Sequence, residues 1–312
     1  MALRRRRDIW DLVVIGGGIA GLTAAWHASR RGLSVALFEA QPACGGQVGT
    51  VNELDDWPAT GEVSGVELAA SIVERIGIEG AGIYYENVAA LEKAGELWQV
   101  KGEKSTLRAK RVIAATGARL RVLGVPGEEK LRGMGVSQCA HCDGGFFKGQ
   151  DVAVIGGGDA ALQEAIVLTE MCKTVHIVVR SELKARRTYA DKAYGKTNVK
   201  FIWDTEVDEI TGDNGVKSLK LRNRKDGKTS ELAVSGVFPF VGVEPNNAFL
   251  PSSIKRDATG RVLTDDQFRS SDPTLFVVGA LRAGYAGDLV SAAGEAAGAV
   301  QKVAAEVSIP AM

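Results

Sequence analysis

The feature that most constrains this fold is a strand, glycine turn and helix motif that occurs twice in the 312-residue chain. The first copy reads GGGIAG over residues 16–21, and the second reads GGGDAA over residues 156–161. Each follows a short apolar run, and the next apolar run begins at the same distance from the turn, at Ser34 and at Thr174. This order is typical of a βαβ unit in a buried parallel sheet. The sequence therefore predicts an internal duplication of that unit.

The remaining apolar runs predict how the two units are joined. Those that read as strands lie at residues 98–100, 111–115, 199–206, 217–222, 236–242 and 275–279. An Ala/Gly-rich helix is expected over residues 289–307. The last strand and helix would complete the first sheet, so we expect the second domain to be inserted in the first. The predicted class is α/β, with two Rossmann-like three-layer domains, residues 1–118 with 247–312 and residues 119–246.

The first glycine turn predicts a dinucleotide site. Gly16 makes the tight turn, Gly18 lets the backbone approach a pyrophosphate, and Gly21 allows close packing of the helix. The helix N-terminus offers N–H groups and a positive dipole to the phosphates. Glu39 ends the second strand and can accept hydrogen bonds from ribose hydroxyls. A glycine turn without a ligand is a much poorer explanation of this complete unit.

The second unit differs where a ribose would be recognised. Gly156 and Gly158 keep the turn, and alanine replaces the third glycine, a common allowance. Val179 takes the place of the Glu39 carboxylate, and Arg180 follows it. Arg180 could pair with a 2′-phosphate, which favours NADP over NAD. A solvated arginine on an exposed face explains the residue nearly as well.

A Cys-x-x-Cys pair, Cys139 and Cys142, precedes the second unit. Half of a zinc site, two structural cysteines and a redox-active disulfide are the three possible interpretations. The other cysteines and the histidines are scattered, so we expect no metal. We favour a redox pair, in which a protonated His141 would stabilise a thiolate and make the disulfide more oxidising. Asp143 is placed to move the proton that thiol–disulfide exchange requires, although a turn or N-cap role stays open.

Composition limits the class of partner and compartment. Lys and Arg number 38, as do Asp and Glu, so no net charge favours nucleic acid or a membrane surface. No apolar stretch is long enough to span a membrane. Four cysteines do not make a secreted disulfide framework, and we expect a reducing, cytoplasmic environment. The basic run at residues 4–7 is interpreted as a solvated tail rather than an export signal.

Together these motifs resemble the low-molecular-weight thioredoxin reductase family of pyridine nucleotide–disulfide flavoenzymes. The resemblance runs from about Asp11 to the C-terminus. The segments that carry it are residues 16–21, 45–47, 57–58, 115–118, 126–128, 139–144, 156–161 and 245–246. It implies a homodimer in which the first unit binds FAD and the second binds NADPH. It also implies that the cysteine pair passes electrons to a thioredoxin-like protein.

The resemblance further implies roles for single residues. Cys142 would face the flavin, and Asp143 would be the proton donor. Further cofactor contacts would fall on Gly46, Gln47, Thr116, Gly117 and Gly279.

Three places depart from the family pattern. Residues 179–181 read Val-Arg-Ser for His-Arg-Arg, residues 279–280 read Gly-Ala for Gly-Asp, and residues 287–288 read Gly-Asp for Arg-Gln. We expect an FAD-dependent disulfide oxidoreductase that takes electrons from NADPH. One alternative is an NADPH-independent relative, either a ferredoxin-linked reductase or an oxygen-using oxidase of small dithiols. The other is a flavin-bound redox sensor without turnover.

Overall fold

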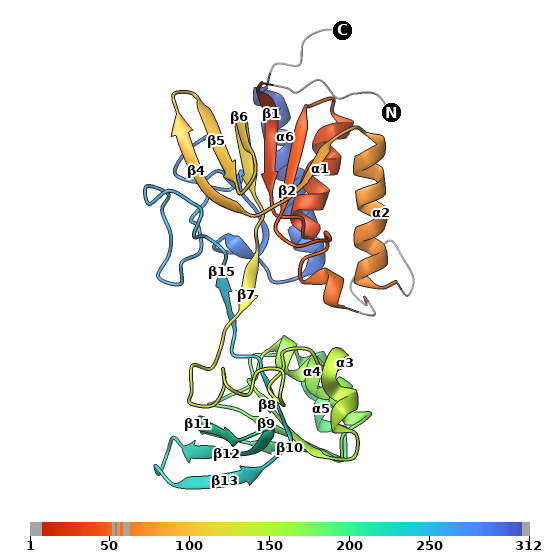
Figure 1. Cartoon of the computed structure of the whole chain (residues 1–312), viewed down its shortest axis with the longest axis vertical. Helices are drawn as coiled ribbons and strands as arrows, with labels where there is room; N and C mark the ends of the chain where they lie inside the picture. Colours follow the sequence, from red (N-terminus) through yellow and green to blue (C-terminus); the bar gives the residue numbers. More distant parts are fainter. Residues whose placement is uncertain (1–7, 52–53, 55–56, 59–62, 308–312) are drawn as a thin grey trace. The chain divides into compact units, whose positions relative to one another are not determined.

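The computed structural model describes residues 8–51, 54, 57–58 and 63–307. The basic run at residues 4–7 lies outside them. The chain divides into two compact units (Figure 1). One is formed by Met1–Arg119 together with Glu244–Met312, and the other by Leu120–Val243.

The first unit is built on a mainly parallel sheet of order β3-β2-β1-β6-β5-β4. Its strands are β1 (Trp10–Ile15), β2 (Val35–Glu39), β3 (Gly82–Tyr85), β4 (Val88–Ala94), β5 (Leu97–Gly102), β6 (Thr106–Ala114) and β16 (Leu275–Val277). β1 runs parallel to both β2 and β6, whereas β4 and β5 form an antiparallel hairpin at one edge. The C-terminal strand β16 pairs in parallel with β6, so the end of the chain completes the first sheet as predicted.

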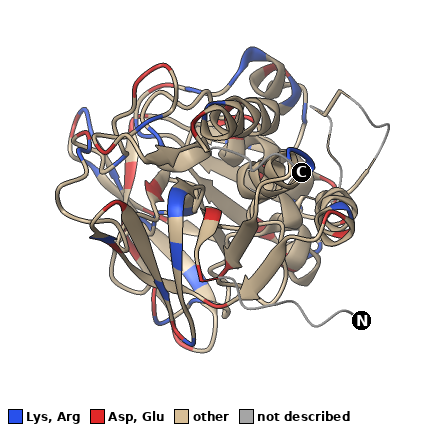
Figure 2. Ribbon diagram, turned by 90° about the horizontal axis from the view of Figure 1, so that it is seen from above, with Lys and Arg blue, Asp and Glu red and all other residues tan. Residues whose placement is uncertain are grey.

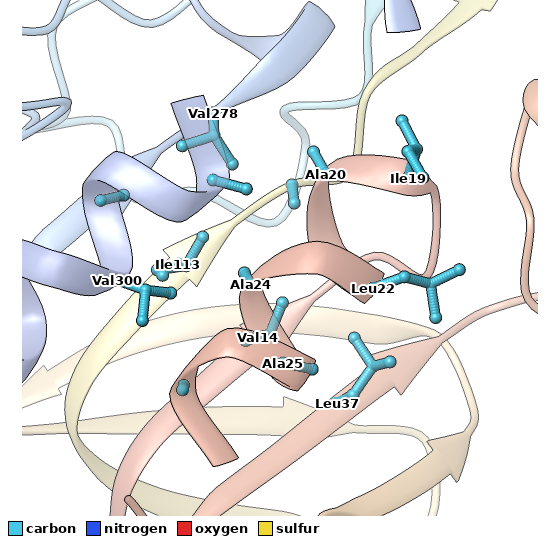
Figure 3. Close-up of a cluster of buried hydrophobic side chains, with 14 of the residues drawn as sticks. Val14, Ile19, Ala20, Leu22, Ala24, Ala25, Leu37, Ile113, Val278 and Val300 are labelled. Carbon is cyan, nitrogen blue, oxygen red and sulfur yellow. The ribbon is translucent and has the colours of Figure 1, made fainter. Parts of the chain in front are cut away.

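Three helices cover one face of this sheet: α1 (Ile19–Arg30), α2 (Gly65–Ile78) and α6 (Leu289–Glu306). Successive β1 residues point to opposite faces, so Val14 enters this helix-side core while Val13 enters a second core. Figure 3 shows Val14, Leu37 and Ile113 of the sheet among side chains of α1 and α6. Buried side chains from residues 249–262 complete the second core. Burial on both faces explains why these strands read as continuous apolar runs.

The second unit repeats this plan on a smaller scale. Its parallel sheet has the order β10-β9-β8-β14, and a separate antiparallel sheet has the order β11-β12-β13. The strands are β8 (Asp151–Ile155), β9 (Thr174–Val178), β10 (Val199–Ile202), β11 (Thr205–Gly212), β12 (Val216–Asn223), β13 (Thr229–Ala233) and β14 (Gly236–Pro239). The helices are α3 (Ala140–Asp143), α4 (Asp159–Thr169) and α5 (Arg187–Tyr194). Short 3-10 turns occur in both units: η1 (Val48–Thr50) and η3 (Gly279–Leu281) lie in the first, and η2 (Gly144–Phe147) lies in the second.

One strand expectation was wrong. Residues 199–206 do not form a single strand, because the chain turns at Asp204, whose φ is +53°. β10 before the turn joins the parallel sheet, and β11 after it pairs antiparallel with β12. The residues before and after the turn therefore belong to different sheets.

The chain passes between the units through two short strands, β7 (Ala118–Leu120) and β15 (Val243–Pro245), which pair with each other. Lys and Arg residues are interspersed with Asp and Glu on the ribbon (Figure 2). Over the described part of the chain, no helix has the length and apolar character needed to cross a bilayer.

Candidate redox and nucleotide sites

The first glycine turn packs so tightly that only glycine fits at two positions. Gly16 has a φ of +104°, and a Cβ there would lie 2.5 Å from the carbonyl oxygen of Ala115. A Cβ at Gly21 would lie 1.7 Å from the carbonyl oxygen of Gly16. The turn and the first helical turn of α1 are thus pressed together against the end of β6. This is the packing that the sequence predicted for the two glycines.

The N-terminus of α1 fits a phosphate group. Its N-cap residue is Gly18, and no side chain caps the helix. The first backbone N–H groups of a helix have no partner within it. A Cβ at Gly18 would approach only the Cα of Gly46, at 4.0 Å, so there is room beside this backbone. Backbone N–H groups without a partner in the helix, a positive helix end and open space together suit the pyrophosphate of FAD.

Glu39 lies beside this turn at the end of β2, and 7% of the residue is exposed. Its Oε2 accepts a hydrogen bond from the Gly17 N–H at 2.7 Å, and its Oε1 accepts one from the Gln41 N–H at 2.7 Å. Each carboxylate oxygen can accept a further hydrogen bond. The two N–H groups therefore fix a carboxylate that can bind ribose hydroxyls.

The other expected cofactor residues gather around the same helix end. Gly46, with a φ of +55°, approaches Gly18, and a Cβ on Gly279 would lie 3.4 Å from Cβ of Ala20. Gln47 donates from Nε2 to the Ala118 carbonyl oxygen at 2.5 Å. Thr116 and Gly117 directly precede Ala118 in the chain. The Thr116 hydroxyl donates to the Asn246 carbonyl oxygen at 2.8 Å, and Gly117 has a φ of +63°.

Sequence reasoning missed one acidic residue of this region, Glu295 of α6. Its Oε2 accepts the Gly279 N–H at 2.8 Å, its Oε1 pairs with Arg282, and 8% of the residue is exposed. The carboxylate therefore fixes Gly279, whose neighbour Ala280 replaces the acidic residue of the family pattern. The sequence signal that could have identified Glu295 is its position as the one acidic residue among the small and apolar residues 289–300.

The second glycine turn has a similar backbone but different surroundings. Gly156 has a φ of +139°, and a Cβ there would lie 2.2 Å from the Phe240 carbonyl oxygen. Gly158 is the N-cap of α4, again without a side-chain cap, and has open space beside it. The Gly157 carbonyl oxygen accepts hydrogen bonds from the Lys184 and Ala185 N–H groups. The loop after β9 is thereby tied to the turn.

Charged residues near the second turn are already in contact with one another. Asp159, the first residue of α4, accepts hydrogen bonds from the backbone N–H and Nε of Arg186, at 2.6 and 2.7 Å. Val179, at the position that Glu39 takes in the first unit, is buried and offers no carboxylate to a ribose. Arg180 is exposed, and its carbonyl oxygen accepts from Arg224. The turn suits a phosphate, and the exposed Arg180 leaves a cation for a 2′-phosphate.

Cys139 and Cys142 form a disulfide, with their Cα atoms 5.3 Å apart. Cys139 is the half-buried N-cap of α3, and its sulfur accepts the Cys142 N–H at 3.1 Å. Cys142 and His141 are exposed. An N–H aimed at the Cys139 sulfur would also stabilise a thiolate there.

Asp143 closes α3 and lies beside a cavity of about 270 Å³. The cavity is also lined by Arg132, Ser137 and Gln138. Asp143 makes no side-chain capping hydrogen bond to the η2 turn that follows it. Its half-buried carboxyl group therefore stands next to the cysteine pair without a capping function.

The remaining two cysteines lie elsewhere. Cys44 is half-buried near Tyr85. Cys172 is buried, and burial raises the pKa of its thiol to about 11. In the ranges that the structure describes, no cluster of His, Cys, Asp and Glu could hold a metal ion.

A sequence model of the pyridine nucleotide-disulphide oxidoreductase family matches residues 10–300. The chain belongs to this family. It is 34% identical over 307 residues to a thioredoxin reductase of Peptoclostridium litorale, covering 96% of each chain. The solved thioredoxin reductase of Lactococcus lactis is 35% identical, with a TM-score of 0.91 over 96% of this chain and 100% of that one. That of T. acidophilum is 30% identical, with a TM-score of 0.89 over 96% and 99%.

These similarities confirm three predictions. The fold is α/β with FAD- and NAD(P)-binding Rossmann-like domains. The protein is a flavin-dependent disulfide oxidoreductase of the thioredoxin reductase type. Its cofactor is FAD, which agrees with the fit of the first glycine turn and Glu39.

Proposed function

We propose that this enzyme passes electrons from NADPH through FAD and the Cys139–Cys142 disulfide to a thioredoxin-like protein. The observation that carries the proposal is a Cys-x-x-Cys disulfide on a short helix in the same unit as the second glycine turn. A thiol pair of this kind exchanges with a partner disulfide, which a module that only binds flavin does not need.

We assign the two units different ligands. Gly16, Gly18 and Glu39 bind the pyrophosphate and ribose of FAD in the first unit, with Gly46, Gln47, Thr116, Gly117 and Gly279 completing the site. Gly156, Gly158 and Arg180 bind NADPH in the second. Bound FAD supplies a carrier that accepts a hydride from a nicotinamide, which the protein residues alone cannot do.

The thiol chemistry follows from the placement of α3. Reduction breaks the sulfur–sulfur bond with two electrons and one proton, which leaves a Cys139 thiolate and a Cys142 thiol. Asp143 supplies a proton to the partner sulfur that this thiolate displaces. We assign Cys142 to the flavin side, which leaves the Cys139 thiolate to attack the partner disulfide. The Cys142 N–H stabilises that thiolate, and we assign His141 the role of adding to this stabilisation whenever its ring carries a proton. Closure of the Cys139–Cys142 bond then releases the partner as a dithiol, so sulfur and electrons balance.

The setting of the second turn favours a second candidate, an NADPH-independent relative. Residue 179 is a buried valine, and Arg186 contacts Asp159, so a 2′-phosphate would depend on Arg180 and on Lys184, which is exposed in the following loop. Such an enzyme would take electrons from ferredoxin, or would oxidise small dithiols and pass electrons to oxygen. We further propose that the enzyme is cytoplasmic, in keeping with its four cysteines, and that it is a homodimer, as the family resemblance implies.

Anaerobic flavin reduction separates these candidates. The purified yellow protein is mixed with NADPH, NADH or reduced ferredoxin, and the flavin absorbance is followed before thioredoxin is added. Bleaching by NADPH and turnover with thioredoxin are expected. Bleaching by ferredoxin alone would transfer the enzyme to the ferredoxin-linked class. Oxygen uptake with a small dithiol, without bleaching by either nicotinamide, would identify an oxidase.

A further inference from the structure

Glu164 of α4 holds the start of the helix that carries the cysteine pair. Its Oε2 accepts a hydrogen bond from the Ala140 N–H at 2.6 Å. Ala140 is the first residue of α3, directly follows Cys139 and is fully buried. The first N–H of a helix has no partner within the helix. Glu164 supplies that partner from a separate element.

The same short helix is fixed by contacts from Cys139 and its neighbours. The Cys139 N–H donates to the Ser137 hydroxyl at 3.1 Å, and the Asp143 N–H donates to the Cys139 carbonyl oxygen at 3.1 Å. These partners are neutral oxygens. The Ala140 contact brings in a carboxyl group, which adds a negative charge when ionised.

The surroundings of Glu164 make its charge unfavourable. Burial raises the pKa of its carboxyl group, and the Ala140 hydrogen bond and the His141 charge offset this only in part, so the pKa stays above its ordinary value. Burial also disfavours a second negative charge near the Glu164 carboxylate, and the two like charges repel each other. A thiolate at Cys139 would be such a charge.

We propose that Glu164 is a positioning residue that sets the reduction potential of the Cys139–Cys142 pair. Its carboxylate holds α3 through Ala140 and opposes thiolate formation in the reduced pair. Reduction takes two electrons and one proton to give a thiol and a thiolate, or two protons to give two thiols. A carboxylate that destabilises the thiolate product favours the disulfide and lowers the potential. The inference rests on the proposed function only in that the pair cycles between these states.

The test is the Glu164→Gln substitution, which keeps an oxygen acceptor for Ala140 and removes the charge. The purified holoprotein is equilibrated with reduced and oxidised dithiothreitol, which supplies the two electrons and closes to its cyclic disulfide. After acid quenching and alkylation, mass spectrometry of the Cys139–Cys142 peptide gives the fraction reduced. We expect a shift of roughly three- to tenfold toward the dithiol, tenfold being about 30 mV for a two-electron couple. The thiol pKa, from the pH dependence of alkylation of the reduced pair, should fall.

Two further variants make the result specific. Glu170→Gln removes an exposed carboxylate that pairs with Lys196 just beyond the other end of α4. This control should leave both the equilibrium with dithiothreitol and the thiol pKa unchanged. Glu164→Asp keeps the charge but shortens its reach, so it should shift the equilibrium less and in the same direction. It also serves if the Gln variant does not fold.

An equilibrium constant and thiol pKa that Glu164→Gln leaves at wild-type values would overturn the proposal. An equal shift in Glu170→Gln would overturn it too. Neither reading needs NADPH or thioredoxin. A protein that shows the shift but never turns over with thioredoxin would contradict the proposed function and support the role of Glu164.

Discussion

At the scale of single residues, Gly21 shows how closely the first nucleotide turn is packed. A methyl group there would meet the Gly16 carbonyl oxygen at 1.7 Å, and backbone cannot move aside as a side chain can. We expect Gly21→Ala to cost about 1–3 kcal/mol of stability and to lower the flavin content of the purified protein. Absorbance per protein and thermal melting measure both effects.

Gly77 provides the matched control. It lies in α2, and a Cβ there would meet nothing within 4 Å. Gly77→Ala should therefore keep the flavin and gain up to about 1 kcal/mol of stability, since alanine favours a helix over glycine. Equal flavin content in the two variants would contradict the packing argument.

Cys142 carries the second prediction at this scale. With Cys142→Ser the pair cannot close, so dithionite should reduce the protein with about one two-electron equivalent per flavin instead of about two. Thioredoxin turnover should be lost. Cys44→Ser, which changes a cysteine outside the pair, should keep the wild-type end point. An unchanged end point in Cys142→Ser would show that the pair does not exchange electrons with the flavin.

At the scale of elements, one acidic residue of α6 forms ion pairs that link this helix to the sheet. Glu306 pairs with Arg111 of β6 at 2.7 Å and also with Arg269. Burial alone would raise the pKa of Glu306, but both arginines outweigh it, and the pKa lies below its ordinary value of 4.5. A lowered pKa in the folded state means that this stability is present above pH 4.5 and is lost as the pH falls below it.

Glu306→Gln should therefore reduce the amount of stability that the protein loses as the pH is lowered. We expect the melting temperatures of the wild type and the variant to differ most above pH 5 and to converge as the pH falls below about 4.5. Thermal melts across this range measure the difference. Glu67→Gln is a comparison variant: the pKa of its carboxyl group is also lowered, but the residue is exposed at the capping box of α2, so we expect a smaller difference with the same pH dependence. A difference that persists unchanged to low pH would contradict the role given to the two arginines.

The accuracy of the sequence predictions also differs from element to element. The βαβ units were found because a turn that admits only glycine leaves a local signature. Asp204 left none, since no glycine or proline marks its turn, and residues 199–206 were joined wrongly into one strand. Glu164 and Glu295 were missed for another reason. Their partners, Ala140 and Gly279, lie on other elements, and only the folded chain brings them together.

At the scale of the whole molecule, the inserted unit enters and leaves the first unit through paired strands. Arg119 of β7 and Glu244 of β15 form an ion pair at 2.6 Å, so the two ends of the first unit's chain lie side by side. Both cores of the first unit are built from residues outside the insertion. A short linker of about four Gly and Ser residues could therefore replace residues 120–243 without strain.

This shortened chain should fold and bind FAD, because the residues we assign to the flavin all belong to the first unit. It should be yellow but unable to reduce thioredoxin, since it lacks the cysteine pair. Flavin content and far-UV circular dichroism measure the two expectations. Glu39→Ala in the same shortened chain should reduce the flavin content, because the Gly17 and Gln41 N–H groups lose their acceptor. A shortened chain that folds but stays colourless would show that flavin binding needs residues of the second unit.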